Sequence, residues 1–339
     1  MPAAPAISVV LPVRNAADTL PAALESLRAQ TRPDWECLVV DDGSTDASAA
    51  LAARFAAADP RFRLLRRPAR GLVPALNDGL AAARGVFIAR LDADDVCAPE
   101  RFAEQAAALE RDPDLGVVSC RVRHGGDRVR QAGFARHVDW LNRLDTPEAI
   151  AANRFIEAPV AHPAVMFRRT LVARWGGYRE GPFPEDYELW LRWLDAGVRF
   201  AQVPRELLVW ADRPDRLSRR DPRYAPATFA AVKAPWLARA IRRTLGGRAL
   251  WVWGAGRTTR RRLEPLWAEG LAPHGFIDVD RHKWGRHRDG RLVVGPDQLP
   301  SPEEALIVVH VGRPGAREWI RARLTAAGYR ETRDFWVAA

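Results

Sequence analysis

Three carboxylates stand together after an apolar run in the first third of the chain. The run Val86–Leu91 is bounded by turn residues, as expected for a buried strand, and Asp92, Asp94 and Asp95 follow it. An ionised carboxylate buried without a partner is costly, so these side chains are expected to face a cleft. Alternate carboxylates of an extended segment can converge on one hard cation, and Mg²⁺ or Mn²⁺ takes oxygen ligands and bridges the phosphates of a nucleotide diphosphate. The alternative is a solvated turn at the end of a strand.

The elements that would position this cluster alternate between strands and helices from the N-terminus. Strands are expected over residues 7–12, 35–40, 62–66 and 86–91, with helices over 20–30, 47–58 and 72–84 between them. This order predicts an α/β fold with a parallel sheet that has helices on both faces. Ligands of such sheets bind beyond the carboxyl ends of the strands, where Asp41, Asp42 and the Asp92–Asp95 cluster are expected.

Composition limits the class and the location of the protein. The chain of 339 residues is long enough for two domains and a substantial core. It has no stretch near the ~18 apolar residues of a membrane span and no basic-then-apolar N-terminal segment. Its three cysteines follow no disulfide pattern. These features favour a cytoplasmic protein, with peripheral attachment to the inner face of the membrane as a variant.

The formal net charge of +10 is uneven along the chain. Residues 213–243 carry nine basic side chains against Asp215 and Asp221, a net of +7. No nucleic-acid motif accompanies them, so we expect no nucleic-acid partner, and a phosphate-bearing substrate or an anionic membrane surface fits better. A helix beginning at Pro235 would have an apolar face that could rest on such a membrane or pack between domains, and we favour packing. The members of this face are Trp236, Leu237, Ala240 and Ile241.

Several segments in a fixed order together resemble the family 2 glycosyltransferases of the GT-A fold. The resemblance extends over roughly residues 6–220. It is carried by Ser8–Asn15 (SVVLPVRN), Val39–Asp46 (VVDDGSTD), Ala89–Asp95 (ARLDADD), Pro99–Phe102 (PERF), His162–Arg168 (HPAVMFR), Gly176–Tyr178 (GGY) and Glu185–Trp190 (EDYELW). It implies that the chain moves a sugar from a nucleotide-diphosphate donor to a hydroxyl of a glycan or lipid-linked acceptor, with inversion at the anomeric carbon.

The resemblance also implies which residues would bind the donor. Asp94 would bind the Mg²⁺ or Mn²⁺ ion that holds the diphosphate, and Asp95 is the weaker choice. Asp92 would face the ribose, while Asp42 would accept a hydrogen bond from the base, although Asp42 could instead cap the next helix. Asn77 matches a recurrent asparagine of the family, without a distinct chemical role. The nucleotide pocket would be lined by Pro12, Val13, Arg14 and Asn15. Of these, Asn15 would equally suit a simple turn.

Asp186 is the candidate catalytic base. Inversion needs a base on the face of the anomeric carbon opposite the departing nucleotide diphosphate, where it removes the proton of the acceptor hydroxyl. The alternative is a helix cap, because Glu185 and Asp186 follow Gly181–Pro184 and precede an apolar helix. Glu185 and Trp190 could contact the acceptor, although Trp190 equally suits a core position.

Two departures from the family pattern bear on the mechanism. Many relatives carry a histidine shortly after the Glu-Asp segment, and here Arg213 stands about where it would fall. An arginine cannot bind a cation but can neutralise a diphosphate directly, so the metal would be held more weakly. The Gln-x-x-Arg-Trp segment and the membrane helices of processive polysaccharide synthases are missing from this sequence, which predicts a non-processive enzyme.

A second α/β pattern follows residue 245 and predicts a small Rossmann-like domain. Its turn Gly254–Gly256 is an incomplete dinucleotide fingerprint, because Thr259 replaces the third glycine, although Asp278 falls near the expected acidic position. Ligand binding and a packing or homo-oligomer role are both open, and we favour the second. The expected domains are 1–212 (GT-A), 213–245 (basic helical linker) and 246–339 (Rossmann-like).

Two other functions share some of these features. A sugar nucleotidyltransferase has a similar sheet and an acidic metal site, but needs a glycine-rich loop after the first strand, where this chain has Leu11–Asn15. A non-catalytic sugar-nucleotide-binding protein would tolerate loss of the metal-binding or base carboxylates, and both are present. The sequence therefore favours the glycosyltransferase over both alternatives.

Overall fold

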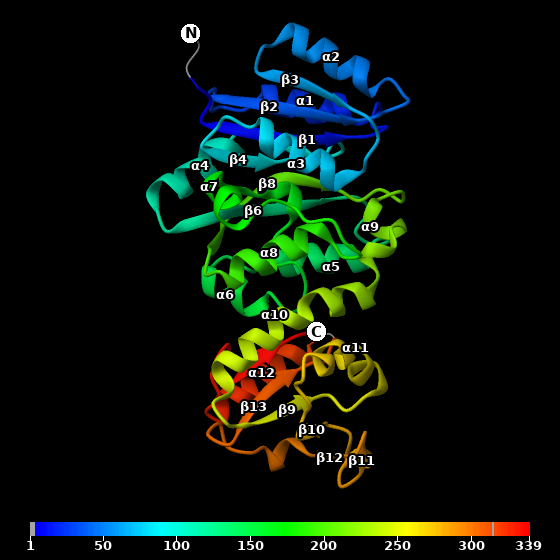
Figure 1. Ribbon diagram of the computed structural model, residues 1–339, viewed down its shortest axis with the longest axis vertical. Coiled ribbons are helices and arrows are strands. Elements are labelled where there is room, and N and C mark those ends of the chain that lie inside the picture. The colour runs from blue at the N-terminus through cyan, green and yellow to red at the C-terminus, as the bar shows by residue number, and fades with distance from the viewer. Residues whose placement is uncertain (1–3, 314) are drawn as a thin grey trace. The chain divides into compact units, whose positions relative to one another are not determined.

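The computed structural model describes residues 4–313 and 315–339, which pack into two compact units. The expected α/β fold is confirmed in both, and Figure 1 shows their helices and strands. The segments 151–158 and 182–191 belong to the C-terminal unit by packing, which no pattern in the sequence indicated. The division at residues 212 and 245 stays a prediction. The N-terminal unit comprises residues 1–150, 159–181 and 192–220, and the C-terminal unit comprises residues 151–158, 182–191 and 221–339.

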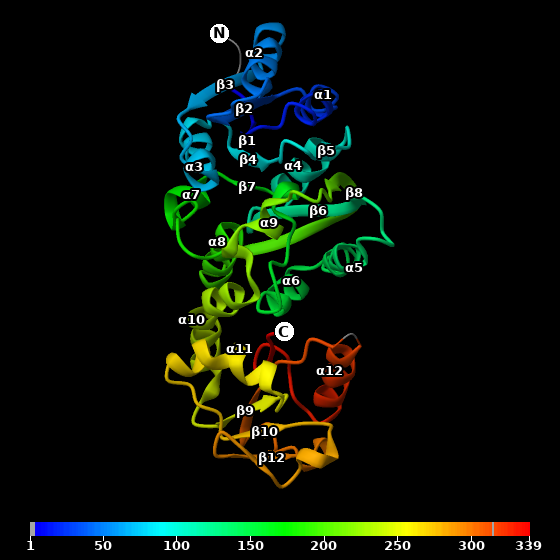
Figure 2. The same ribbon diagram turned by 90° about the vertical axis from the view of Figure 1, so that its right-hand side faces the viewer.

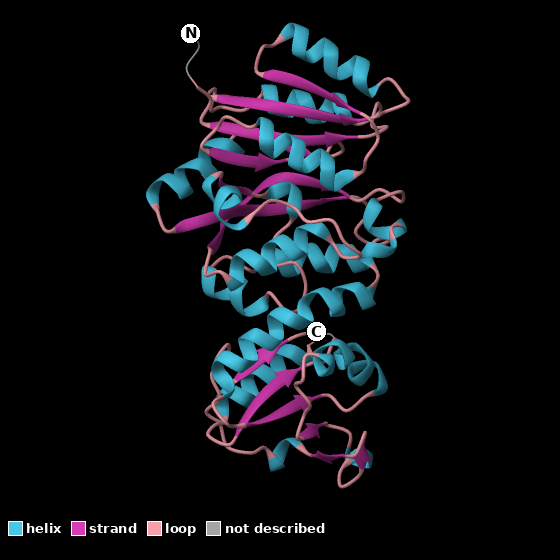
Figure 3. Ribbon diagram, in the orientation of Figure 1, coloured by secondary structure: helices cyan, strands magenta, loops and turns pink. Residues whose placement is uncertain are grey.

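The N-terminal unit is built on one sheet with the strand order β3-β2-β1-β4-β7-β6-β8-β5. Its first four strands are parallel, as the sequence predicts, and the arrows of β1 to β3 point to one edge (Figure 3). Every residue of β1 and β2 is buried, and α1 and α3 lie on opposite sides of these strands (Figure 2). The elements are β1 (Ile7–Val13), α1 (Leu20–Arg28), β2 (Trp35–Asp42), α2 (Ser48–Ala58), β3 (Phe62–Arg67), α3 (Leu72–Ala82) and β4 (Phe87–Arg90).

The second half of this sheet corrects the expectation of a wholly parallel arrangement. The short strand β7 runs antiparallel to both of its neighbours, β4 and β6, and β5 runs antiparallel to β8. β5 follows β4 with no helix between them, so the regular alternation that gives parallel pairing ends after β4. The chain here forms β5 (Val96–Cys97), α4 (Arg101–Arg111), β6 (Leu115–Gly125), α5 (Ala132–Leu141), α6 (Pro147–Asn153), β7 (Met166–Arg168), α7 (Thr170–Trp175), α8 (Glu185–Asp195), β8 (Arg199–Ala211) and α9 (Leu217–Arg220).

The C-terminal unit contains the small sheet expected after residue 245. Its strand order is β11-β12-β10-β9-β13-β14, and all pairs are parallel except that of β11 with β12. The helices α11 and α12 lie on opposite faces of this sheet (Figure 2). The elements are α10 (Pro226–Leu245), β9 (Ala249–Trp253), α11 (Arg257–Ala268), β10 (Gly275–Ile277), β11 (His287–Arg288), β12 (Arg291–Val294), β13 (Ala305–Val309), α12 (Ala316–Ala326) and β14 (Phe335–Val337).

The apolar face of the basic segment is buried in the core of the C-terminal unit. Leu237 and Ile241 of α10 belong to one core cluster with Leu250 of β9. Pro235 lies inside α10, which begins at Pro226, so the expected helix start is wrong. The sequence favours packing between domains over membrane contact; the structure shows this face packed inside the C-terminal unit, and membrane contact through the segment stays a prediction. In the described part of the chain, no helix combines the length and the apolar character that crossing a membrane requires.

A buried carboxylate ties β2 to its neighbours in the N-terminal unit. Glu36 of β2 is 2% exposed. It accepts hydrogen bonds from Ser8 Oγ at 2.7 Å, from Arg63 Nη1 at 2.8 Å and from the backbone N–H of Arg84 at 3.0 Å. Burial raises the pKa of Glu36, but the hydrogen bonds from these three residues outweigh it and lower the pKa from 4.5 to about 2. The charged form of Glu36 therefore stabilises this unit.

Glu36→Gln should lower the free energy of unfolding at pH 7 by about 3 kcal/mol, the scale for breaking a buried pair, because Arg63 and Arg84 lose their counter-ion. Folding lowers the pKa of Glu36, so the ionised side chain contributes fully to the free energy of unfolding at any pH above its pKa in the unfolded chain. This contribution is lost as the pH falls toward the pKa of Glu36 in the folded protein. Urea unfolding should therefore show the variant and the parent converging between about pH 5 and 2.

Glu25→Gln is the matched control, because it removes only an exposed pair with Arg28. It should change the free energy of unfolding by less than about 0.5 kcal/mol at any pH. Equal losses in the two variants at pH 7 would contradict the role given to Glu36.

Candidate functional site

Three carboxylates meet where β4 ends, as the sequence predicts. Asp92, Asp94 and Asp95 each offer an oxygen, and these oxygens all lie within 4.8 Å of one another. The side chain of Asp92 is 35% exposed, whereas Asp95 is almost fully buried. Because β4 and β2 both pair in parallel with β1, the cluster lies at the same sheet edge as Asp41 and Asp42 at the end of β2.

Few positive charges and hydrogen-bond donors offset the negative charge of this carboxylate cluster. The buried Arg90 forms an ion pair with Asp92, and the backbone N–H of Ala211 donates to Asp95 Oδ1 at 2.8 Å. Asp95 Oδ2 is buried and has no hydrogen-bond partner among the described residues. Burial and the charge of Asp92 raise the pKa of Asp94 to about 6, and burial and both neighbouring carboxylates raise the pKa of Asp95. The cluster is short of positive charge and can accept a cation.

Asp42 holds the loop that precedes α3. Its two oxygens accept the backbone N–H groups of Arg70 at 2.7 Å and Gly71 at 2.9 Å. Asp42 does not cap the next helix, which was the alternative role, because α2 begins after Ala47. The half-exposed guanidinium of Arg14 lies 3.5 Å from Asp42 Oδ2. The structure therefore brings together two of the residues expected to contact the nucleotide.

Asn15 joins the loops that follow β1 and β2. It has a positive φ of 50°, its N–H donates to Ser44 Oγ at 3.0 Å, and its Oδ1 accepts the N–H of Thr45 at 2.8 Å. These contacts fit the turn role that the sequence left open. Pro12 and Val13 are buried at the end of β1, so their side chains support this edge of the sheet from beneath.

Asn77 has a clear structural role that the sequence did not indicate. Its Nδ2 donates to the carbonyl of Tyr178 at 2.9 Å, and its Oδ1 accepts the N–H of Tyr178 at 3.0 Å. Gly177 leaves room for this pairing, because a Cβ there would lie 2.7 Å from Asn77 Oδ1. Tyr178 Oη in turn lies 2.7 Å from His162 Nε2, and Tyr178 interacts electrostatically with Arg90. Asn77 therefore holds Tyr178, which interacts with both His162 and Arg90.

Two arginines act on the charge of Asp94, Arg90 and, with the larger effect, Arg216. Its positive charge partly offsets the rise in the pKa of Asp94 that burial and Asp92 cause, and its guanidinium lies 4.2 Å from the ring centre of Phe134. Arg213, which the sequence indicated, pairs with Asp215 at 3.2 Å, and its side chain is 43% exposed. Both arginines follow β8 at similar distances in sequence, so spacing alone could not separate them.

Asp212 is a further residue of this region that the sequence analysis missed. Its fully buried carboxylate lies 2.5 Å from Arg219, 3.6 Å from Arg216 and 3.4 Å from His124 Nε2. It therefore orders the segment that carries Arg216. A signal was present, because Asp212 follows a strand directly, as the other acidic residues of the site do.

The candidate base and its neighbours lie in the C-terminal unit. α8 begins at Glu185, so Asp186 stands in the first helical turn, and its Oδ1 accepts the N–H of Tyr187 at 2.7 Å. Glu185 is 2% exposed and accepts a hydrogen bond from Tyr224 Oη at 2.8 Å. Trp190 is fully buried, in keeping with the core alternative, and presents no surface to an acceptor. The catalytic roles of Asp186 and Glu185 stay predictions.

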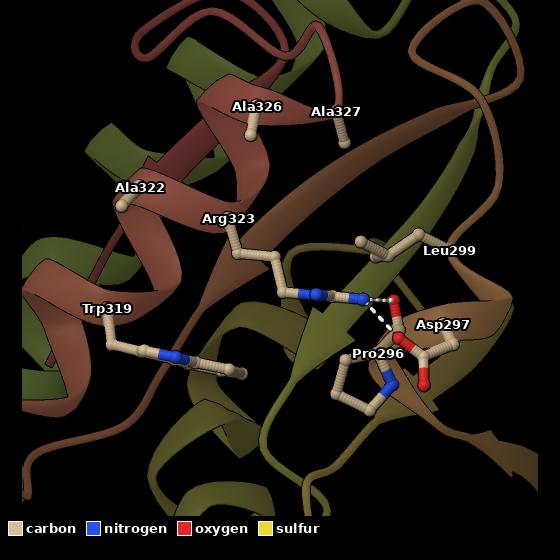
Figure 4. A pocket seen from close by; sticks show the side chains of 8 residues that line it. All are labelled: Pro296, Asp297, Leu299, Trp319, Ala322, Arg323, Ala326 and Ala327. Atoms are coloured by element: carbon tan, nitrogen blue, oxygen red, sulfur yellow. Dashed lines mark hydrogen bonds and ion pairs between the residues drawn. The ribbon is translucent and has the colours of Figure 1, made fainter.

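The C-terminal unit also carries a shallow groove that contains none of the predicted site residues. The groove has a volume of about 520 Å³ and lies between α12 and the turn after β12 (Figure 4). The side chains of Trp319 and Arg323 both point from α12 toward this turn, where Arg323 pairs with Asp297. It has no carboxylate cluster, so the groove is not the place for metal-assisted chemistry.

Comparison with known proteins gives a consistent result. Residues 8–176 match the sequence model described as Glycosyl transferase family 2. The chain is 30% identical over 230 residues to EpsE of Bacillus subtilis (strain 168), which is named a putative glycosyltransferase. The match covers 66% of this chain and 80% of that protein. It is also 30% identical over 209 residues to the amylovoran biosynthesis glycosyltransferase AmsE of Erwinia amylovora, covering 60% and 74% of the two proteins.

A solved structure shares the fold. The mannosyltransferase PcManGT from Pyrobaculum calidifontis, in complex with GDP-Man and Mn²⁺, matches with a TM-score of 0.55 at 23% identity. The match covers 79% of this chain and 70% of that one. At this identity the likeness concerns the fold alone.

Asn77→Asp should lower the free energy of unfolding by about 1–3 kcal/mol, because a carboxylate cannot donate to the Tyr178 carbonyl. Asn142 offers a matched comparison, since its side chain makes the same two hydrogen bonds to the backbone of Val122. Asn142→Asp should therefore cost a similar amount in urea unfolding followed by tryptophan fluorescence. A loss in Asn142→Asp alone would show that the pairing of Asn77 does not stabilise the protein.

Proposed function

The chain belongs to the family 2 glycosyltransferases, and we propose that it moves single sugars, with inversion, from a nucleotide-diphosphate donor to a hydroxyl of a glycan or lipid-linked acceptor. The observation that carries the proposal is the carboxylate cluster at the end of β4, at the same sheet edge as Asp42. Family membership sets aside the nucleotidyltransferase and the non-catalytic alternatives. The name of AmsE refers to polysaccharide biosynthesis, which supports a glycan acceptor here. We also propose a cytoplasmic location.

A divalent cation fits the carboxylate cluster. All of its donors are carboxylate oxygens, which Mg²⁺ and Mn²⁺ prefer, and Asp95 Oδ2 is buried without a hydrogen-bond partner among the described residues. Asp94 would hold the ion, because Arg90 already pairs with Asp92 and Ala211 with Asp95. The bound ion would stabilise the negative charge that develops on the leaving diphosphate. The Mn²⁺ in the PcManGT complex supports this assignment.

The donor nucleotide would lie along the ends of β1 and β2. Asp42 uses both oxygens to hold the loop before α3, but each carboxylate oxygen has two lone pairs and can still accept a hydrogen bond from a base. Arg14 lies beside it with a half-exposed guanidinium that can reach a phosphate. Arg216 would add positive charge next to Asp94 and would thereby take the role that the sequence assigns to Arg213.

Asp186 would remove the proton of the acceptor hydroxyl. Its side chain is partly exposed, so a hydroxyl can approach it, and an ionised carboxylate is favourable in the first turn of a helix. The buried Glu185 would keep the start of α8 in place through its bond to Tyr224.

Asp94→Asn should abolish Mn²⁺-dependent nucleotide binding and leave the fold intact, because it removes one of three repelling charges and opens no cavity. Titration calorimetry with UDP and GDP, each with and without Mn²⁺, measures the binding. In the absence of Mn²⁺ the variant should melt at the same temperature as the parent or above it. Asp114→Asn, at an exposed position of the same unit, is the control. Unchanged Mn²⁺-dependent affinity would exclude Asp94 as the ligand.

Asp186→Asn should retain donor binding and slow transfer by at least ~10²-fold, the scale for a positioned general base. Asparagine keeps the shape and can still accept the N–H of Tyr187, but it lacks basicity. The donor would be the nucleotide sugar that gives the largest Mn²⁺-dependent thermal shift in a panel of UDP- and GDP-sugars, and turnover would be followed as release of the nucleoside diphosphate. Near-normal turnover would leave Asp186 with a structural role only.

A further inference from the structure

The carboxyl edge of the C-terminal sheet is covered by a segment from the middle of the chain. Phe155 is 1% exposed and packs edge-to-face on Trp336 of β14, with ring centres 5.3 Å apart. The guanidinium of Arg154 lies over both rings. Lys233 of α10 donates from Nζ to the carbonyl of Phe155 and to that of Ala338, directly after β14. Ligands of open α/β sheets bind beyond this edge, and here the protein fills part of it with its own backbone.

The Rossmann-like turn is also occupied by contacts within the unit. Asp278 Oδ2, which a dinucleotide site would use for a ribose hydroxyl, accepts the N–H of Ala255 at 2.9 Å and Lys283 Nζ at 3.0 Å. Thr259, at the position of the third glycine, donates from Oγ1 to the carbonyl of His310 at 2.9 Å. The polar groups of the fingerprint therefore brace the unit itself.

The segment that this unit holds carries the candidate base. Tyr187, next to Asp186, is fully buried, donates from Oη to the carbonyl of Arg154 at 2.7 Å, and lies 5.5 Å from the ring of Phe229 of α10. Tyr224 donates from Oη to Glu185 Oε2 at 2.8 Å. The first turn of α8 is thus attached to the C-terminal unit through the residues on each side of Asp186.

We propose that the C-terminal unit is a support for the catalytic base, and that Tyr224 is a positioning residue that acts on Asp186 through Glu185. The inference rests on the proposed role of Asp186 as the base. Tyr224 is well placed for this, because it ends a short turn, η2 (Pro222–Tyr224), that is locked by an ion pair of 2.7 Å between Arg223 and Asp221.

The physical reason is the repulsion between two adjacent carboxylates. Glu185 and Asp186 are consecutive in the first turn of α8, so their negative charges repel each other. The hydroxyl of Tyr224, at the end of η2, donates to Glu185 Oε2 and holds this carboxylate toward η2. Asp186 then keeps one orientation toward the acceptor, which matters because a misplaced base loses most of its effect.

Tyr224→Phe in the chain of 339 residues tests the proposal, with Tyr329→Phe as the matched control. Tyr329 lies in the C-terminal unit as well, is buried where Tyr224 is partly exposed, and likewise donates a hydrogen bond, to the carbonyl of Pro300 at 2.7 Å. We expect Tyr224→Phe to lower turnover about 10-fold, the scale of one hydrogen bond, with an unchanged KM for the donor. Hydrogen exchange should become faster in residues 185–191 of this variant alone. Equal effects of the two variants on turnover and exchange would overturn the proposal.

A double-mutant cycle with Asp186→Asn separates this inference from the proposed function. If Tyr224 acts through Asp186, adding Tyr224→Phe to Asp186→Asn should cause no further loss of turnover. Losses that multiply would show that Tyr224 acts independently of Asp186 and would overturn the inference alone. Normal turnover in Asp186→Asn would overturn the base assignment, and the inference with it.

Discussion

Repulsion among carboxylates at one sheet edge is the constraint on which the N-terminal unit depends. The parallel register of β1, β2 and β4 brings Asp42 and the Asp92–Asp95 cluster to the same edge, and they cannot separate without breaking the sheet. The buried Arg90 and the N–H of Ala211 neutralise only part of this charge, so the pKa values of Asp94 and Asp95 are raised. A concentration of like charge at a sheet edge lowers stability, and such sites are typical of function.

The loops around this edge of the N-terminal sheet are fixed in the same way. In each case a polar side chain of one segment forms hydrogen bonds with the backbone of another. Asn15 joins the loops after β1 and β2, Asp42 holds the loop before α3, and Asn77 holds Tyr178. Each of these contacts satisfies backbone groups that a loop would otherwise leave to water. The proposed donor site is therefore preorganised by residues that also make the turns possible.

The two units use the same α/β architecture for different purposes. In the N-terminal unit the carboxyl ends of the strands carry the acidic site. In the C-terminal unit the corresponding edge is covered by Phe155 and braced by Asp278, and α10 binds the segment around Asp186. A Rossmann-like sheet therefore does not by itself indicate a nucleotide site, since function depends on the groups that are left free at its edge.

The sequence by itself determined the order of strands and helices, the acidic residues at the strand ends and the family, because apolar periodicity and turn chemistry are local. Only the tertiary structure decided the antiparallel course of β7, the action of the charge of Arg216 on Asp94, and the hydrogen bonds of Asn77 to Tyr178. Asn77 and Tyr178 are 101 residues apart, and Asp95 and Ala211 are 116 apart. The approach of such distant groups is set by the packing of the whole sheet, and no local spacing in the chain encodes it.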